Sequence, residues 1–226
     1  GPNGKIVQLK ANKIGSECFR LWKACEAQVG DDFHINPEEI EQKYFGVLTK
    51  IFNVARFASQ FPVPSNLNKV PTELNIEDMW ILLEFNLVIK NAKKAWSEID
   101  IYSAGQAIKT FGTGLLPSHW LEMVKSRLYD GDLKATWTIH RIVHDLLIIM
   151  SPITPFFTHY LSSVVYEKSC LDEELFPSLS LPNYILSREK ELVSITPSLM
   201  RFNSEVWKQK KDSGISLKSE LSGISI

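Results

Sequence analysis

Hydrophobic residues recur every three or four positions along most of the chain, which is the spacing of an α-helix. The clearest case runs from Pro37 to about Ser59. Its apolar residues fall within an arc of about 80° on a helical wheel, and they are Ile40, Tyr44, Leu48, Ile51, Ala55 and Ala58. Asn36 and Pro37 begin this helix, because asparagine caps helices and proline suits the first helical position.

The same spacing predicts helices over most of the remaining sequence. Besides 37–59, the predicted helices are 17–28, 76–97, 101–116, 117–129, 133–150, 155–168 and 187–211. Ser16 and Asn75 are expected to cap two of them, Gly112 and Gly114 to interrupt a third, and Pro197 to kink or split the last. Strand-like alternation does not persist before residue 214. The predicted fold class is therefore all-α, a helical bundle with a C-terminal helical arm.

The helix over 37–59 carries a second stripe that faces away from its apolar one. This stripe is centred roughly 135° away and consists of Lys43, Gly46, Lys50, Asn53 and Phe57, with Arg56 one step around. An exposed ring beside cations and an amide can stack an unpaired base and hold its phosphate. By periodicity alone, the commoner alternative is that Phe57 packs under another helix or loop.

Composition limits the kinds of partner that the chain can have. Its 226 residues are 44% hydrophobic and 23% charged, with a net charge of −1. No overall field attracts nucleic acid, so a nucleic-acid site must be local. Three cysteines (Cys18, Cys25 and Cys170) without a CxxC pair predict a reducing compartment. The most apolar run, 142–153, is too short and too polar to span a bilayer. We therefore expect a cytoplasmic protein without membrane contact.

Few residues suggest catalysis or metal binding. His140 and His144 have metal-ligand spacing, but Arg141 lies between them and no third ligand is near in sequence. Phosphate-binding loops, nucleophile elbows and zinc-protease motifs do not occur. Three basic clusters, 90–94, 125–127 and 208–211, fit solvated helix faces or complement helix dipoles, and as phosphate contacts they would supply affinity. We predict no catalytic residue and no metal site.

Four motifs occur in order between residues 15 and 158, namely GSECFRLW at 15–22, KIFNVARF at 50–57, DMWILLEFN at 78–86 and SPITPFFT at 151–158. They resemble motifs of class I aminoacyl-tRNA synthetases of the valyl, isoleucyl and leucyl group, from the end of the catalytic domain into the anticodon-binding domain. His159 stands where these enzymes usually have a glutamate. Residues 118–128 look most like the valyl members, with the isoleucyl members next.

The resemblance implies a fragment of a larger enzyme, as does a chain that starts with Gly1 instead of Met. The HIGH-type and KMSKS-type signatures are absent, so the parent would be an ATP-dependent ligase whose ATP and Mg²⁺ bind elsewhere, with no cofactor in this chain. Residues 1–30 would form a connector helix that leaves the catalytic domain, 31–170 the anticodon-binding bundle, and 171–226 a linker, a helix and the start of a further module.

The resemblance also implies two partners, the anticodon loop of a tRNA and the catalytic domain of the same parent chain. Phe57 would stack a base and Asn53 would contact a base edge. Lys50 and Arg56 would contact base edges or phosphates, and Lys43 lies on the same stripe. One alternative is a protein-interaction bundle in which Phe57 docks a partner helix. Another is an independent enzyme, which no group of residues supports.

Overall fold

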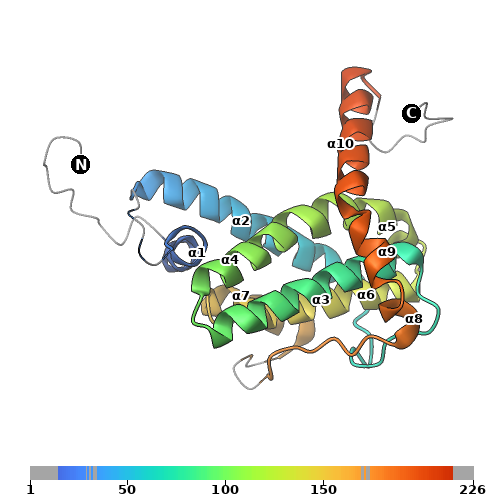
Figure 1. The fold of residues 1–226 in the computed structure, drawn as a ribbon, viewed down its shortest axis with the longest axis horizontal. Helices are drawn as coiled ribbons and strands as arrows, with labels where there is room; N and C mark the ends of the chain where they lie inside the picture. Colours follow the sequence, from blue (N-terminus) through green and yellow to red (C-terminus); the bar gives the residue numbers. More distant parts are fainter. Residues whose placement is uncertain are drawn as a thin grey trace, which may run out of the picture.

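The computed structural model describes residues 15–215 except 29, 31, 33, 34, 169, 170, 172 and 173. All regular structure in these residues is helical (Figure 1), which confirms the all-α fold class. The elements are α1 Ser16–Glu26, α2 Pro37–Ala58, α3 Ile76–Ser97, α4 Ile101–Thr110, the π-helix η2 Phe111–Trp120, α5 Leu121–Tyr129, α6 Leu133–Met150, α7 Pro155–Tyr166, α8 Asn183–Leu186, α9 Glu189–Ser194 and α10 Thr196–Asp212.

One hydrophobic core joins the helices from α1 to α9, and its largest fully buried side chains include Tyr44, Trp80 and Trp120. Helix α1 packs against α2, α4 and α7 and shares this core. It approaches α4 so closely that a Cβ on Gly105 would lie 2.4 Å from the carbonyl oxygen of Ala24. Glycine is therefore required where α1 and α4 cross. The domain boundary expected near residue 30 stays a prediction.

The helix starts follow the predicted caps in one case out of three. The Asn36 side chain accepts hydrogen bonds from the backbone N–H groups of Glu38 and Glu39, as expected. Asn75 is the N-cap residue of α3, but its side chain makes no capping bond. Ser16 is already helical, and Gly15 precedes it as the N-cap residue. Capping by Asn36 thus helps to hold α2, the helix that carries the motif KIFNVARF at 50–57.

The predicted interruption at Gly112 and Gly114 and the predicted start of a new helix at Pro117 are both wrong. Helices α4, η2 and α5 follow one another without a gap, and they form one long rod. The middle segment adopts the wider π pattern around Pro117. In a regular α-helix the proline ring would clash with the carbonyl oxygen four residues earlier, so the wider turn lets the rod continue. Gly112 lies against Ile51 of α2, which packs η2 beside that helix.

The C-terminal part ends in a projecting arm. Pro197 does split the last predicted helix, because α9 ends at Ser194 and α10 begins at Thr196 with the proline in its first turn. Helix α10 stands away from the bundle (Figure 1) and has no buried residue. Two tryptophan side chains are among the groups that attach it to the bundle. Trp80 donates a 2.8 Å hydrogen bond to the hydroxyl oxygen of Thr196, and the ring of Trp207 stacks on His119.

Candidate functional site

The last turns of α2 and the segment from Pro117 to Glu122 flank an open pocket of about 360 Å³. Its lining residues are Lys50, Asn53, Val54, Arg56, Phe57, Gln60, Pro117, Leu121 and Glu122. Val54 and Leu121 are buried, and the two amides and the charged side chains are exposed. The rod described above supplies one wall and α2 the other. Four of the five side chains predicted to bind tRNA, namely Lys50, Asn53, Arg56 and Phe57, thus meet at one pocket.

Phe57 is half-buried instead of standing free outside the core. Its ring centroid lies 5.2 Å from that of Phe61 and 5.8 Å from that of Tyr129, both in edge-to-face geometry. The ammonium nitrogen of Lys125 lies 5.8 Å from the same centroid. Edge-to-face packing holds an aromatic ring in one orientation. Phe57 therefore forms a wall of the pocket that is packed against two other rings, and Tyr129, which is 62% exposed, extends the aromatic cluster outward.

Lys50, Asn53 and Arg56 project into solvent around this wall. Lys50 and Arg56 form no ion pair with any residue that the structure describes. The guanidinium carbon of Arg56 lies 5.9 Å from the ring centroid of Phe52 on the preceding turn. Both cations are therefore free to contact an anionic ligand at the pocket.

Lys43 is not part of this pocket. Its ammonium group lies 2.6 Å from the Glu26 carboxylate of α1, which the Tyr44 hydroxyl also donates to. Burial by itself raises the pKa of Glu26, but the hydrogen bonds from Lys43 and Tyr44 outweigh it, so the pKa lies below its usual value. Glu26 is thus ionised and neutralises Lys43, and the lysine serves the packing of α1 on α2.

The basic cluster over 125–127 divides between two roles. Lys125 joins the pocket edge, where it also lies 3.2 Å from Glu122. Arg127 points to the other side of α5 and pairs with Glu77, Asp78 and Asp132 at 2.7–2.8 Å. Asp78 is fully buried, and burial raises its pKa although Arg127 opposes the shift. Arg127 therefore ties α5 to α3, and it is not available to a ligand.

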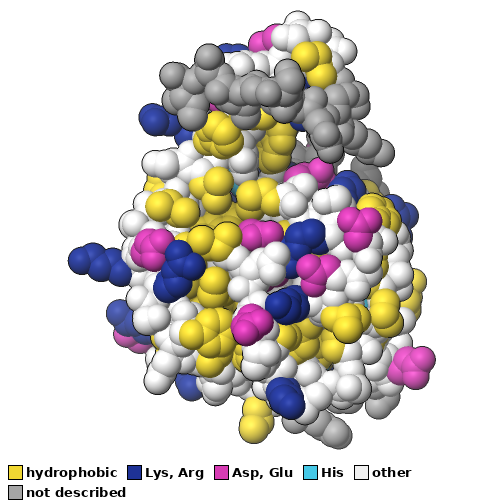
Figure 2. Space-filling model, turned by 90° about the vertical axis from the view of Figure 1, so that its right-hand side faces the viewer, with side chains coloured by type: hydrophobic (Ala, Val, Ile, Leu, Met, Phe, Trp, Pro, Cys, Tyr) yellow, Lys and Arg dark blue, Asp and Glu magenta, His cyan; other side chains and the backbone are white. Residues whose placement is uncertain are grey.

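The second wall of the pocket was not predicted from the sequence. Pro117, Leu121 and Glu122 line it, Tyr129 lies next to it, and Gln60 adds to the α2 wall. The one available signal was the resemblance of residues 118–128 to a synthetase segment. Figure 2, drawn from the side where α5 lies in Figure 1, shows hydrophobic side chains interspersed with basic and acidic ones. Among the residues that the structure describes, this face carries no continuous basic surface, in line with a local site.

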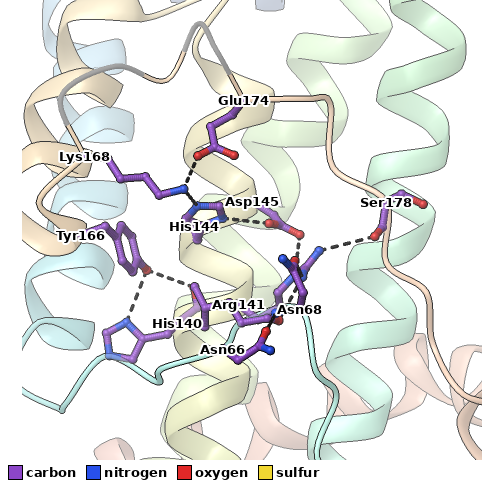
Figure 3. A network of polar contacts seen from close by, with 11 residues as sticks. Asn66, Asn68, His140, Arg141, His144, Asp145, Tyr166, Lys168, Glu174 and Ser178 are labelled. Atoms are coloured by element: carbon purple, nitrogen blue, oxygen red, sulfur yellow. Dashed lines mark hydrogen bonds and ion pairs between the residues drawn. The ribbon is translucent and has the colours of Figure 1, made fainter.

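His140 and His144 are both held in a polar network on α6 (Figure 3). His140 is fully buried and bonds the carbonyl oxygen of Phe61 and the hydroxyl group of Tyr166. Burial lowers the pKa of His140. His144 contacts Asp145 through Nδ1 at 3.0 Å and Lys168 through Nε2 at 3.1 Å. Both ring nitrogens of each histidine already have partners, so neither ring offers a metal a free nitrogen.

Arg141 links the same network to two loops. It pairs with Asp145 at 2.8 Å and donates to the carbonyl oxygen of Leu67 and to the side chain of Asn68. It also reaches the carbonyl oxygen of Ser178 after α7. The network therefore fastens the segments before α3 and after α7 to α6 (Figure 3). The described residues hold no group of three or more His, Cys, Asp or Glu placed to bind a metal ion.

His159 has a structural contact in place of the family glutamate. Its Nε2 accepts a 3.2 Å hydrogen bond from the backbone N–H of Leu171. A carboxylate could accept the same bond, so the exchange preserves a tie between α7 and the segment after it.

Among the described helices, none combines the length and the hydrophobicity needed to cross a membrane.

Comparison with known proteins places these features in a family. Residues 78–225 match the model of the anticodon-binding domain of tRNA ligase. This stretch includes the α5 wall of the pocket, and the α2 wall precedes it. The valine–tRNA ligase of Saccharolobus solfataricus is 33% identical over 168 residues, which are 74% of this chain and 20% of that protein.

Two further valine–tRNA ligases align with nearly the whole chain, including α2. Identity is 28% over 224 residues for the Aeropyrum pernix protein, covering 95% of this chain and 26% of that protein. It is 29% over 232 residues for the Pyrobaculum aerophilum protein, covering 98% of this chain and 28% of that protein. The chain thus spans a fifth to just over a quarter of the length of these relatives. From the all-α fold and the match over residues 78–225, the chain belongs to the family of anticodon-binding domains of tRNA ligases.

Proposed function

We propose that the chain is the anticodon-binding part of a valine–tRNA ligase and that the pocket between α2 and α5 receives an unpaired base of the anticodon loop. The observation that carries this proposal is the meeting of Lys50, Asn53, Arg56 and Phe57 at one pocket. Stacking on an aromatic side chain together with cationic backbone contacts is how proteins hold single-stranded nucleic acid.

Each side chain has a separate role in this proposal. Phe57 stacks the base, because neighbouring rings hold its orientation. The Asn53 amide both donates and accepts, so it can bond the edge of the base. Lys50 and Arg56, which have no described ion-pair partner, contact phosphates of the loop and fix its position.

The choice of valine rests on the relatives, which are valine–tRNA ligases, and on the valyl-like segment over 118–128. In the parent enzyme, ATP and Mg²⁺ bind to the catalytic domain. The 226 residues of this chain form another part of that enzyme and carry no cofactor. The parent acts in the cytoplasm. Within the chain, residues 1–30 connect to the catalytic domain, 31–170 form the anticodon-binding bundle, and 171–226 lead toward a further module.

Binding of an RNA hairpin tests the proposal. The probe is the anticodon stem-loop of tRNA-Val, titrated against the 226-residue chain by fluorescence anisotropy. Phe57→Ala should weaken binding about 5- to 150-fold, because one base stack is worth about 1–3 kcal/mol. Phe45→Ala is the matched control: Phe45 is on the same helix, is 65% exposed and does not line the pocket. It should bind like the wild type.

Two further measurements separate RNA binding from protein docking and from misfolding. Asn53→Ala should weaken binding, because it removes the amide that bonds the base edge. Asn53 is exposed, so the melting temperature should stay the same. Binding should also fall steeply with salt, with a slope of log affinity against log salt of about −0.7 for each phosphate contact. Equal affinity of Phe57→Ala and the wild type, or indifference to anticodon substitution, would contradict the proposal. A salt-independent interaction would instead favour a hydrophobic docking site.

A further inference from the structure

Helix α7 has the composition of a buried helix, although one of its faces is exposed. None of its 12 residues is Asp, Glu, Lys or Arg. The residues that face the core lie within an arc of about 100°, and they are Thr158, Leu161, Ser162 and Val165. The exposed residues on the opposite side are Phe156, Tyr160, Ser163 and Val164. A helix at the surface of a soluble protein normally carries charged side chains on its outer face, and one without them is normally covered.

Three large apolar side chains form a row along this outer face, and we call Phe156, Tyr160 and Val164 the α7 stripe. They are four residues apart, so neighbouring Cβ atoms lie about 5–6 Å from each other. Their exposed fractions are 73%, 58% and 59%. Single exposed apolar residues are common in soluble proteins, but a contiguous apolar patch marks an interaction site. The α7 stripe therefore has the character of a docking surface.

The composition of α7 favours a protein partner over a nucleic acid. Nucleic-acid binding depends on Lys and Arg side chains that neutralise phosphates, and α7 has neither residue type. No residue of α7 lines the pocket between α2 and α5. Aromatic side chains are enriched in the centres of protein interfaces, where charged ones are depleted. The partner of the stripe is thus an apolar protein surface.

Hydrogen bonds fix the start of α7 to helix α1. The Glu17 carboxylate accepts a 3.3 Å bond from the backbone N–H of Phe157, in the first turn of α7. One turn later on α1, Arg20 donates to the carbonyl oxygens of Ile153 at 2.8 Å and Pro152 at 3.0 Å, just before α7. Helices α1 and α7 accordingly lie at the same end of the bundle (Figure 1). A domain that connects to α1 therefore comes close to the α7 stripe.

We propose that the α7 stripe packs against the catalytic domain of the parent enzyme, which rests on the proposed function because α1 is the helix that leads to that domain. The relatives contain enough additional chain for this contact, since the aligned residues are only 20–28% of their length. Burial of the three side chains removes apolar surface from water and so stabilises the contact. A hydrophobic contact at this place also limits the motion between two domains that are otherwise joined by a linker.

Hydroxyl-radical footprinting read by mass spectrometry tests the proposal on the 226-residue chain and on the full-length parent enzyme, both without RNA. Phe156 and Tyr160 should be oxidised about five-fold or more slowly in the parent, because the centre of an interface excludes water. Tyr129 is the matched control, since it is 62% exposed on α5 and should be oxidised at the same rate in both proteins.

Two outcomes of the footprinting overturn the proposal. One is equal oxidation of Phe156 and Tyr160 in the two proteins. The other is slower oxidation of both residues in the 226-residue chain as its concentration rises, because a second copy would then cover the stripe.

A charged variant tests whether the stripe itself makes the contact. Tyr160→Asp should leave the melting temperature and the hairpin affinity of the 226-residue chain nearly unchanged, because the side chain is exposed and outside the pocket. In the parent it should remove most of the protection of Phe156, because burial of an unpaired carboxylate is costly. Leu133→Asp is the matched control. Leu133 is 76% exposed and lies at the end of α6 opposite to the turn before α7, so this variant should keep the protection.

Unchanged protection of Phe156 in the Tyr160→Asp parent would also overturn the proposal. Failure of this proposal and failure of the proposed function are distinguishable. The footprinting uses no RNA, and the hairpin titration uses only the 226-residue chain. If the stripe is not covered in the parent, the effect of Phe57→Ala on hairpin binding remains. If the proposed function fails, the wild-type chain binds the valine hairpin no better than one of unrelated loop sequence.

Discussion

The close approach of α1 and α4 allows a stability prediction with its own control. In Gly105→Ala the added Cβ would lie 2.4 Å from the carbonyl oxygen of Ala24 and 2.8 Å from its carbonyl carbon. To reach an ordinary contact of 3.4 Å, the two backbones must separate by roughly 1 Å, and such a gap forfeits a quarter to a half of the dispersion energy between the facing atoms. Overpacking of this kind costs about 1–3 kcal/mol.

Helix propensity partly offsets this cost, because alanine is favoured over glycine inside a helix by about 0.5–1 kcal/mol. We expect a net loss of about 1 kcal/mol, which lowers the melting temperature of a chain of this size by about 2–4 °C. Thermal unfolding followed by circular dichroism measures the shift. Gly46→Ala makes the same chemical change on the exposed face of α2, where an added Cβ meets nothing within 4 Å.

Gly46→Ala should therefore raise the melting temperature by about 1–4 °C. The difference between the two variants isolates the collision with α1, since both gain the same helix propensity. A Gly105→Ala chain that melts at or above the wild-type temperature would refute the reasoning. It would mean that α1 and α4 do not cross backbone to backbone at this point, or that they separate without loss.

Further predictions concern ion pairs and caps. Arg127→Met should lower the free energy of unfolding by about 3–5 kcal/mol in urea titrations, because it leaves the buried Asp78 without its cation; a loss below about 1 kcal/mol would contradict the buried network. Asn36→Ala should cost about 0.5–2 kcal/mol by the same measurement, and Asn75→Ala, whose side chain makes no capping bond, should cost much less. Glu26→Gln should be less stable than the wild type above pH 4.5, and the difference should shrink as the pH falls further, because the folded protein holds the pKa of Glu26 below 4.5. A difference that stays constant with pH would show that the ion pair is not its source.

Local patterns were sufficient for most helices. The helix over 37–58 follows from Asn36, Pro37 and the spacing of its apolar residues, and these act within one or two turns. The same spacing placed the last residues of α2 with Lys50, Asn53 and Arg56 toward solvent. Prediction failed at Pro117, where local rules indicate a break. Packing against α2 and the wider π turn keep the rod intact there.

The candidate site was predictable only on one side. The α2 wall lies within a single helix, so helical geometry brings its residues together. The opposite wall comes from residues more than fifty positions later, and Glu122 has no local pattern that sets it apart from other exposed glutamates. Lys125 and Arg127 are two residues apart and chemically alike in the sequence, but one faces the pocket and the other enters a buried ion-pair network.

The sequence by itself determined most of the helices, the apolar face of α2 and the family resemblance, and it identified four side chains that lie at the pocket. Each of these depends on short-range spacing or on motifs that can be read along the chain. Only the tertiary structure decided that Lys43 is neutralised by Glu26, that Phe57 is held by Phe61 and Tyr129, and that Glu122 completes the pocket. These outcomes depend on which faces of distant helices meet, and that is set by packing of the whole core.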